Sequence, residues 1–144
     1  MAKTVEELLV YQRAEEMWDA VNAILQAPRL RQDLRLHGQL ADASDSVVSN
    51  ISEGFEQPTD RAFARYLFIS KASAAEVRTR VTCAKKRGYV AAANCQRALE
   101  LAEEVKKMCT GLARYLLESN RKDRGLPRSL PTTRTSGVRA LKNR

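Results

Sequence analysis

Ser46-Val47-Val48-Ser49-Asn50-Ile51-Ser52-Glu53-Gly54-Phe55 is the most distinctive stretch of the chain, because it puts polar side chains where a helix normally buries apolar ones. Around it, apolar residues recur at steps of four and three, the spacing of residues on one face of a helix. Two neighbouring stripes result, namely Leu36, Leu40, Ala43, Val47, Asn50 and Gly54, and beside them Ser44, Val48, Ile51 and Phe55. The pattern predicts one long helix with an unusually wide apolar face.

The width of this apolar face predicts an oligomer. A helix in a lone small bundle needs one apolar stripe, so two adjoining stripes indicate burial against its own bundle and against another subunit. Asn50 lies within the first stripe, where a polar side chain costs stability and specifies how helices pair. We interpret Asn50, Ser49 and Glu53 as a structural polar layer and favour this interpretation over a catalytic or ligand site.

A buried Glu53 would need a cation or backbone donors, and Arg65 is its expected partner. Removing one partner of such a pair should destabilise the protein more than removing both. The residues expected in the polar layer or at an oligomer interface are Ser49, Asn50, Glu53, Arg65, Glu76, Val48, Ile51 and Phe55.

Three further helices are expected from the same periodicity. The first spans approximately Val5 to Ala27, and the last ends near Asn120. Between them, a long helix is capped by Thr59 or Asp60 and continues until Gly88. Its seam is Phe63, Leu67, Ser70, Ala74, Val77, Val81 and Ala84. No segment alternates with period two, so the predicted fold class is all-α, an antiparallel up-down four-helix bundle with short connections.

The ends of the helix through Asn50 are also predicted. A charged connector, Arg29 to Asp33, precedes it. The helix is expected to end at Gly54, because glycine adopts the left-handed conformation of a helix C-terminus without steric cost. Pro58 follows closely and is consistent with a break there.

Charge divides the chain into two parts. The formal net charge of the 144 residues is +8, but residues 1–120 carry 17 Lys and Arg against 16 Asp and Glu. Residues 121–144 carry eight against one, with two prolines and few apolar residues. A segment of such composition buries too little apolar surface to offset the conformational entropy lost when its backbone becomes ordered. We therefore expect a four-helix domain over 1–120 and a disordered basic tail over 121–144.

The Lys and Arg side chains are the candidate nucleic-acid contacts, through phosphates. The candidates on the third long helix and its end are Arg78, Arg80, Lys85, Lys86 and Arg87, and those of the tail are Arg121, Lys122, Arg124, Arg128, Arg134 and Arg139. For the first group a solvated helix end remains an alternative, since cations also offset the helix dipole there. No aromatic residue follows Tyr115, so the tail cannot stack on bases and its binding should be electrostatic.

No residue pattern indicates catalysis, a metal or a cofactor. Cys83, Cys95 and Cys109 lack metal-ligand spacing, and His37 is the single histidine, with no nucleophile at a recognisable distance. Neither a leader nor an apolar run of membrane-spanning length is present, so we expect a protein of the reducing cytoplasm without membrane contact. The expectation is a protein that is not an enzyme.

Several blocks in register resemble the family of 23S rRNA intervening-sequence proteins and, more remotely, the accessory variability proteins of diversity-generating retroelements. The blocks are Val5 to Ala14, Ser46 to Phe55, Phe63 to Ile69, and Ala84-Lys85 with Gly88-Tyr89. The resemblance implies a small homo-oligomer, typically a five-fold ring, that binds nucleic acid and, in retroelements, a reverse transcriptase. Ala41-Asp42-Ala43-Ser44 replaces the Arg-Arg-Ala-Ala usual in the family, so a basic surface on this helix is partly lost.

The expected function is therefore a non-enzymatic homo-oligomer, most simply a pentamer, that binds RNA or DNA mainly through phosphates. The alternative is a structural adaptor whose ligand is a protein, such as a retroelement reverse transcriptase. In that case the basic tail would serve solubility or docking.

Overall fold

The computed structural model describes residues 2–122, and of residues 120–122 only the backbone. Its elements are the 3-10 helix η1 (Val5–Glu7) and the α-helices α1 (Leu9–Ile24), α2 (Pro28–Gln32), α3 (Leu34–Phe55), α4 (Asp60–Lys86) and α5 (Ala92–Lys122). No strand occurs between residues 2 and 122. The predicted all-α class is confirmed.

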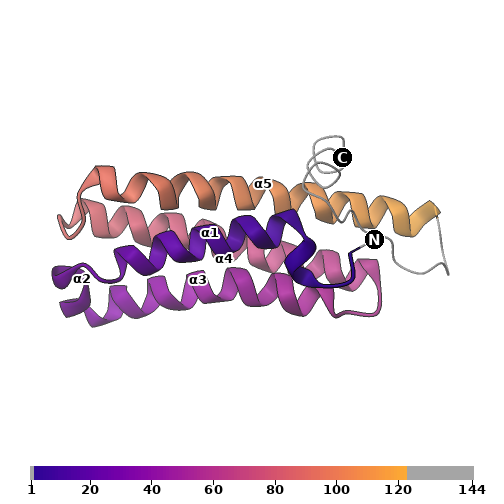
Figure 1. The fold of residues 1–144 in the computed structure, drawn as a ribbon, viewed down its shortest axis with the longest axis horizontal. Helices are drawn as coiled ribbons and strands as arrows, with labels where there is room; N and C mark the ends of the chain where they lie inside the picture. The colour runs from indigo at the N-terminus through magenta and orange to yellow at the C-terminus, as the bar shows by residue number, and fades with distance from the viewer. Residues whose placement is uncertain (1, 123–144) are drawn as a thin grey trace.

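The four long helices lie side by side, and each runs opposite to the one before it (Figure 1). The main contacts join α1 to α3 and α5, and α4 to α3 and α5. Accordingly α1 and α4 occupy one diagonal of the arrangement. The short helix α2 and the connection from α4 to α5 lie at one end, and the connection from α3 to α4 lies at the other (Figure 1).

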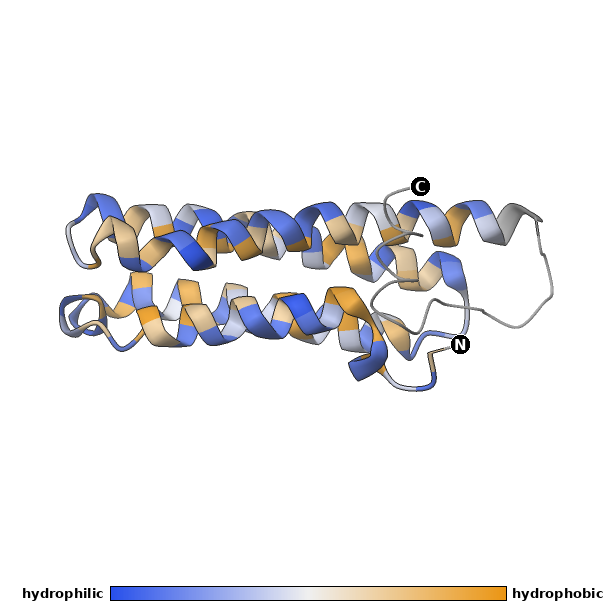
Figure 2. Cartoon of the chain, turned by 45° about the horizontal axis from the view of Figure 1, so that its top comes forward, coloured by the Kyte–Doolittle hydropathy of each residue, from blue (hydrophilic) through white to orange (hydrophobic). Residues whose placement is uncertain are grey.

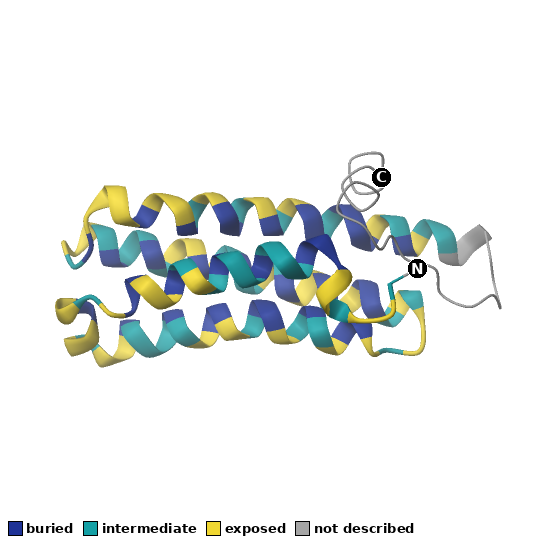
Figure 3. Cartoon of the chain, in the orientation of Figure 1, coloured by how far each residue is buried: buried dark blue, intermediate teal, exposed yellow. Residues whose placement is uncertain are grey.

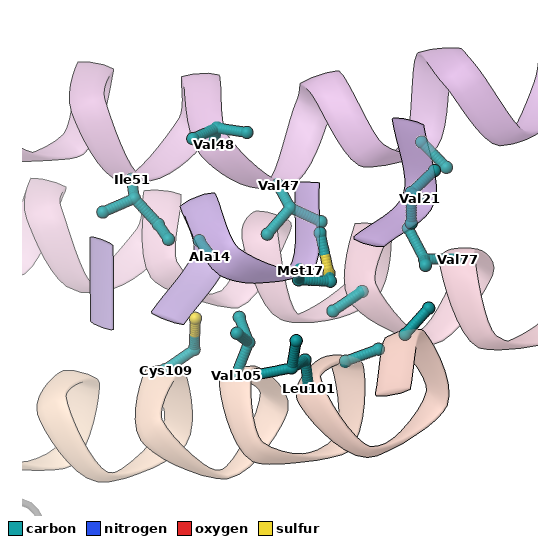
Figure 4. Packing of buried hydrophobic residues seen from close by; sticks show 14 of the residues in the cluster. Ala14, Met17, Val21, Val47, Val48, Ile51, Val77, Leu101, Val105 and Cys109 are labelled. Carbon is teal, nitrogen blue, oxygen red and sulfur yellow. The ribbon is translucent and has the colours of Figure 1, made fainter. Parts of the chain in front are cut away.

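Apolar side chains from all four long helices meet in one core. Met17 of α1, Val47 of α3, Val77 of α4 and Val105 of α5 are each 0% exposed and point toward the shared centre (Figure 4). The hydrophobic and the buried positions follow the same inward faces of the helices (Figures 2 and 3). Burial of these faces is the main source of stability, at about 25 cal/mol for each Å² of apolar surface.

Both apolar stripes of α3 are buried within a single chain. Leu40 and Val47 of the first stripe are 0% exposed, and Val48 and Phe55 of the second are 6% and 8% exposed. The inference that the second stripe needs another subunit for its burial is therefore wrong. The reason is that α3 packs against α1 on one side and α4 on the other, and two neighbours require a wide face. The oligomer itself stays a prediction.

The predicted course of α4 is confirmed at its start, along its seam and at its end. Thr59 Oγ1 accepts a hydrogen bond from the Ala62 backbone N–H at 3.1 Å and caps the helix. All seven predicted seam residues are buried. Gly88 has φ +76°, and the backbone N–H groups of Gly88 and Tyr89 donate to the carbonyls of Lys85 and Ala84, each at 3.0 Å. This pair of bonds is a Schellman ending, which satisfies carbonyls that the helix leaves over.

The predicted first helix and the charged connector differ from the structure. The chain over 5–27 contains η1, then Leu8 with ψ 130° and 2% exposure, and then α1, which ends at Ile24. The backbone of Leu8 is extended, which interrupts the helix, and its side chain is buried in the core. Most of the connector belongs to α2, since Pro28 suits a first helical position and Leu30, 0% exposed, anchors the turn.

Gly54 does not end α3 in a left-handed conformation. It lies inside the helix, one residue before Phe55, and Gly88 alone has a positive φ among the described glycines. A Cβ built on Gly54 would lie 2.7 Å from Tyr66 Cβ and 2.9 Å from Phe63 Cδ1 of α4. The glycine is therefore needed for the close approach of two helices.

Candidate nucleic-acid interface

Two of the predicted phosphate-binding residues of α4 already have carboxylate partners. Arg78 Nη1 lies 2.9 Å from Glu103 Oε2 of α5, and Arg80 Nε lies 3.5 Å from Glu76 Oε2, one turn earlier in α4. Both are partly solvent-exposed pairs, whose contribution to stability is small. The predicted cluster is thus not a group of five unengaged cations, and Glu76 is an ion-pair partner, not a member of a polar layer.

The fold adds other cations to the remaining three residues. Helix α2 and the start of α3 lie at the same end as the last turn of α4 and the start of α5 (Figure 1). Residues 28–37 and 85–97 together carry seven Lys and Arg against one Asp. We call these seven cations the basic end, and they are Arg29, Arg31, Arg35, Lys85, Lys86, Arg87 and Arg97.

The basic end gives the folded domain a charge asymmetry. Residues 1–120 carry 17 Lys and Arg against 16 Asp and Glu, and the basic end accounts for seven and one of these. The rest of the domain therefore carries ten cations against fifteen anions. The net charge of residues 1–120 is close to zero because a positive end and a negative remainder of the domain nearly cancel.

Asp33 organises the basic end. Its carboxylate accepts hydrogen bonds from the Leu36 backbone N–H at 3.2 Å, from the Tyr89 hydroxyl at 2.9 Å and from Arg87 Nη1 at 2.7 Å. These donors, the Leu36 N–H first and then Tyr89, lower the pKa of Asp33 below its ordinary value. The carboxylate caps α3 and ties it to the end of α4 at the same time.

Among the other cations of this end, Arg29 contacts Tyr89 and Gly88, whereas Arg31 and Arg35 are exposed to solvent. The Arg29 guanidinium stacks 5.3 Å from the centre of the Tyr89 ring, and its Nη1 donates to the Gly88 carbonyl at 3.4 Å. Among residues 2–119, no ion pair engages Arg31 or Arg35, and both are exposed. Exposed positions at this end lie on α2, on the start of α3 and on the first turn of α5 (Figure 3).

Sequence reasoning missed four of these seven cations, namely Arg97 and the group Arg29, Arg31 and Arg35. About fifty residues separate Arg29, Arg31 and Arg35 from Lys85, so no local pattern joins these three to the predicted cations. The predicted up-down topology carried the signal, because the first and third connections of such a bundle lie at the same end.

The predicted polar layer is half-buried and joins α3 to α4. Asn50 Nδ2 donates to the Ser46 carbonyl at 2.8 Å and lies 2.9 Å from Ser46 Oγ. Ser46 Oγ in turn lies 2.8 Å from Ser73 Oγ of α4. Ser49 is exposed and bonds only within its own helix. The layer therefore links two helices of one chain at the border of the core.

The remaining residues of that prediction do not form a polar site or an exposed interface. Glu53 and Arg65 are both exposed, and no ion pair joins them in the described part of the chain. Val48, Ile51 and Phe55 are buried in the chain's own core, and Phe55 makes an edge-on contact with Phe63 at 6.2 Å. Little of their surface is therefore left for contact with a second subunit.

Arg121 and Lys122 lie in the last turn of α5, so the helix passes the predicted domain boundary at residue 120. The other predicted contacts of the tail, Arg124, Arg128, Arg134 and Arg139, lie outside the described residues.

Two of the cysteines are buried, and the histidine contacts a backbone carbonyl. Burial raises the pKa of the Cys109 thiol to about 12 and also raises that of Cys95. His37 Nε2 lies 3.1 Å from the Leu25 carbonyl oxygen, between α3 and the end of α1. Within the described residues, no three His, Cys, Asp or Glu side chains come together as a metal site. No described helix is long and apolar enough to cross a membrane.

The fold and the charge distribution define a small all-α protein with a positively charged end. Residues 6–111 match the family model described as 23S rRNA-intervening sequence protein, and the chain belongs to this family. The resemblance predicted from the sequence blocks is confirmed. Comparison with curated proteins gave no significant match.

Proposed function

We propose that this protein binds RNA or DNA through phosphates, at the basic end of an antiparallel up-down four-helix bundle, without catalysing a reaction. The observation that carries the proposal is that the segments at one end of the molecule hold seven cations and one carboxylate, Asp33, which Arg87 engages, on a domain whose other charges are mostly negative. A polyanion would approach this end and be repelled by the rest of the domain.

The chemistry of the basic end favours phosphate over bases. Arg and Lys supply donors that match phosphate oxygens, and such contacts hold a nucleic acid without reading its sequence. Tyr89 is the aromatic residue of this end, but Arg29 covers its ring, and its hydroxyl donates a hydrogen bond to Asp33. It is therefore poorly placed for stacking on a base, which supports weak sequence preference.

The basic segment 121–144 adds to this function in the proposal. Its eight Lys and Arg against one Asp provide further phosphate contacts on the same chain. In a homo-oligomer, several copies of both elements would act on one strand, so that avidity adds to a modest individual affinity. The pentameric ring and the cytoplasmic location implied by the sequence stay predictions.

Salt-dependent binding tests the proposal. We would measure the affinity of the full chain, of a 1–122 truncation and of the double variant Arg31→Glu, Arg35→Glu for single-stranded RNA and DNA across a salt series. The matched control is Lys107→Glu, Arg114→Glu, which reverses two exposed cations on α5 away from the basic end. Each lost phosphate contact should reduce the slope of log affinity against log salt by about 0.7.

The expected result is a slope smaller by about 1.4 for the basic-end variant, with a smaller change for the control. Equal losses in the two double variants would refute the assignment to the basic end. If no form binds either nucleic acid, the adaptor function, with a protein such as a reverse transcriptase as ligand, becomes the leading hypothesis.

A further inference from the structure

The outer face of α4 carries an apolar patch that no other described part of the chain covers. Phe68 is 41% exposed, Ile69 is 42% exposed, and Leu117 of α5 beside them is 36% exposed. They line a shallow hollow of about 520 Å³ with Arg61 and Arg65 at its edge. Three large apolar side chains gathered at one hollow are typical of an interaction surface. We call this surface the α4 face.

The outer face of α1 carries negative charge, whereas the α4 face carries the positive charge of Arg61 and Arg65. Tyr11 and Trp18 are half-buried on the side of α1 next to α3, and Trp18 Nε1 donates to Asp45 Oδ1 at 2.8 Å. Burial and then the negative charges of Glu15 and Glu6 raise the pKa of Tyr11. We call this surface, with Tyr11, Glu15, Trp18, Asp19 and Asp45, the α1 face.

Cations are absent from the α1 face as far as the structure describes it. The one cation of α1 is Arg13, and it points to α5, where its Nε lies 2.9 Å from Glu104 Oε1. Its Nη1 is also held at 2.8 Å by Glu16 Oε2. The α1 face therefore presents two aromatic side chains among carboxylates, whereas the α4 face presents apolar side chains beside guanidinium groups.

The two faces are placed so that copies of the chain can bind head to tail. Because α1 and α4 lie on a diagonal, their outer faces look in opposite directions. They also lie at a similar height along the helices. Trp18 reaches Asp45 on α3, and the next residue of α3, Ser46, meets Ser73 of α4, one residue after Ala72 at the hollow.

We infer that the α4 face of one copy binds the α1 face of a second copy, an inference that rests on the homo-oligomer in the proposed function. Arg61 and Arg65 meet the carboxylates of the α1 face, and Phe68 and Ile69 cover its aromatic side chains. Since the two surfaces differ, the contact is heterologous. A contact of this kind at similar height closes into a ring when its rotation divides a full turn.

The first test is the mass of the full-length chain and of single-face variants, measured by analytical ultracentrifugation over a range of concentrations. Phe68→Asp should weaken association by about 30-fold or more, as expected for a central apolar contact. The control Leu34→Asp changes a side chain that is 80% exposed at the other end of the molecule and should leave the mass unchanged. Glu15→Arg, Asp19→Arg should also dissociate the oligomer.

A mixture decides whether the contact is heterologous. The Phe68→Asp chain keeps its α1 face, and the Glu15→Arg, Asp19→Arg chain keeps its α4 face, so together they should form a one-to-one dimer of about twice 16.2 kDa. Adding Arg61→Glu, Arg65→Glu to the second variant should restore the larger assembly by exchanging the charges.

A monomeric wild-type protein, an unchanged mass of the Phe68→Asp variant, or a mixture that stays monomeric would each overturn the inference. Salt-dependent binding of RNA, measured on the same samples, keeps this failure separate from that of the proposed function. A monomer that still binds RNA overturns the interface alone.

Discussion

Replacing Gly54 by alanine should destabilise the protein, although alanine is the better helix former. The added Cβ would lie 2.7 Å from Tyr66 Cβ and 2.9 Å from Phe63 Cδ1. Ordinary contacts between carbon atoms are about 3.5–4.0 Å, so nearly 1 Å is missing on the side of Tyr66. Because Tyr66 Cβ is fixed to its backbone, a rotamer change cannot relieve the clash, and α3 and α4 must move apart.

The magnitude follows from two opposing effects. Overpacking that shifts the backbone costs about 1–3 kcal/mol, and the upper part of that range applies because both obstructing residues belong to a packed helix. Replacing glycine by alanine inside a helix contributes about 1 kcal/mol in the opposite direction. The net loss for Gly54→Ala should be about 2 kcal/mol in the free energy of unfolding.

Gly38→Ala is the matched control, since Gly38 lies in the same helix and a Cβ there meets nothing within 4 Å. It should gain about 0.5–1 kcal/mol from helix propensity alone. Urea unfolding at fixed protein concentration, followed by circular dichroism, compares the two variants with the wild type. A difference near 3 kcal/mol corresponds to a separation on the order of 12 °C in Tm. A Gly54→Ala protein as stable as the wild type would refute the close-approach argument.

Other contacts lead to further predictions. Asp33→Asn should lower Tm at neutral pH. Because the pKa of Asp33 is depressed in the folded state, the difference from wild type should decrease below pH 3.8 and vanish as pH falls through the folded pKa. Thermal melts measure this difference, and an equal difference at all pH values would contradict the prediction. Cys109, with its pKa raised to about 12, should react with a thiol reagent only after unfolding, whereas the half-buried Cys83 reacts in the native protein; mass spectrometry of the labelled peptides distinguishes them. Thr59→Ala should cost about 1 kcal/mol by removing the cap of α4, whereas Thr59→Asp should retain most of the stability in the same unfolding assay.

The seam of α4 could be predicted from the sequence residue by residue. An unbroken four-three rhythm between a capping Thr59 and Gly88 leaves one way to bury the apolar side chains, and that is the way observed. The polar stretch around Asn50 was harder. Helical spacing placed Asn50 in a packing seam, but a position on the edge of the core and one inside it differ by a fraction of a turn. Only the tertiary structure shows that Asn50 is half-buried and bonds to Ser46, which in turn meets Ser73 of α4.

The candidate site shows the same division. Arg78 was predicted as a phosphate contact because it precedes a run of cations, yet Glu103 of α5 engages it. A sequence displays the charge of a side chain but not the distant carboxylate that neutralises it. Conversely, the sequence assigns Arg31 to a connector, but the structure places it in α2, at the same end of the molecule as the last turn of α4.

The sequence by itself determined the helical class, the family and the face that each long helix buries, because these depend on the spacing of residues along one segment. The tertiary structure alone decided that both stripes of α3 serve one chain, that Gly54 admits Tyr66, and that cations fifty residues apart share one end. Such features depend on distances between segments, and burial and ion pairing respond to those distances irrespective of separation along the chain.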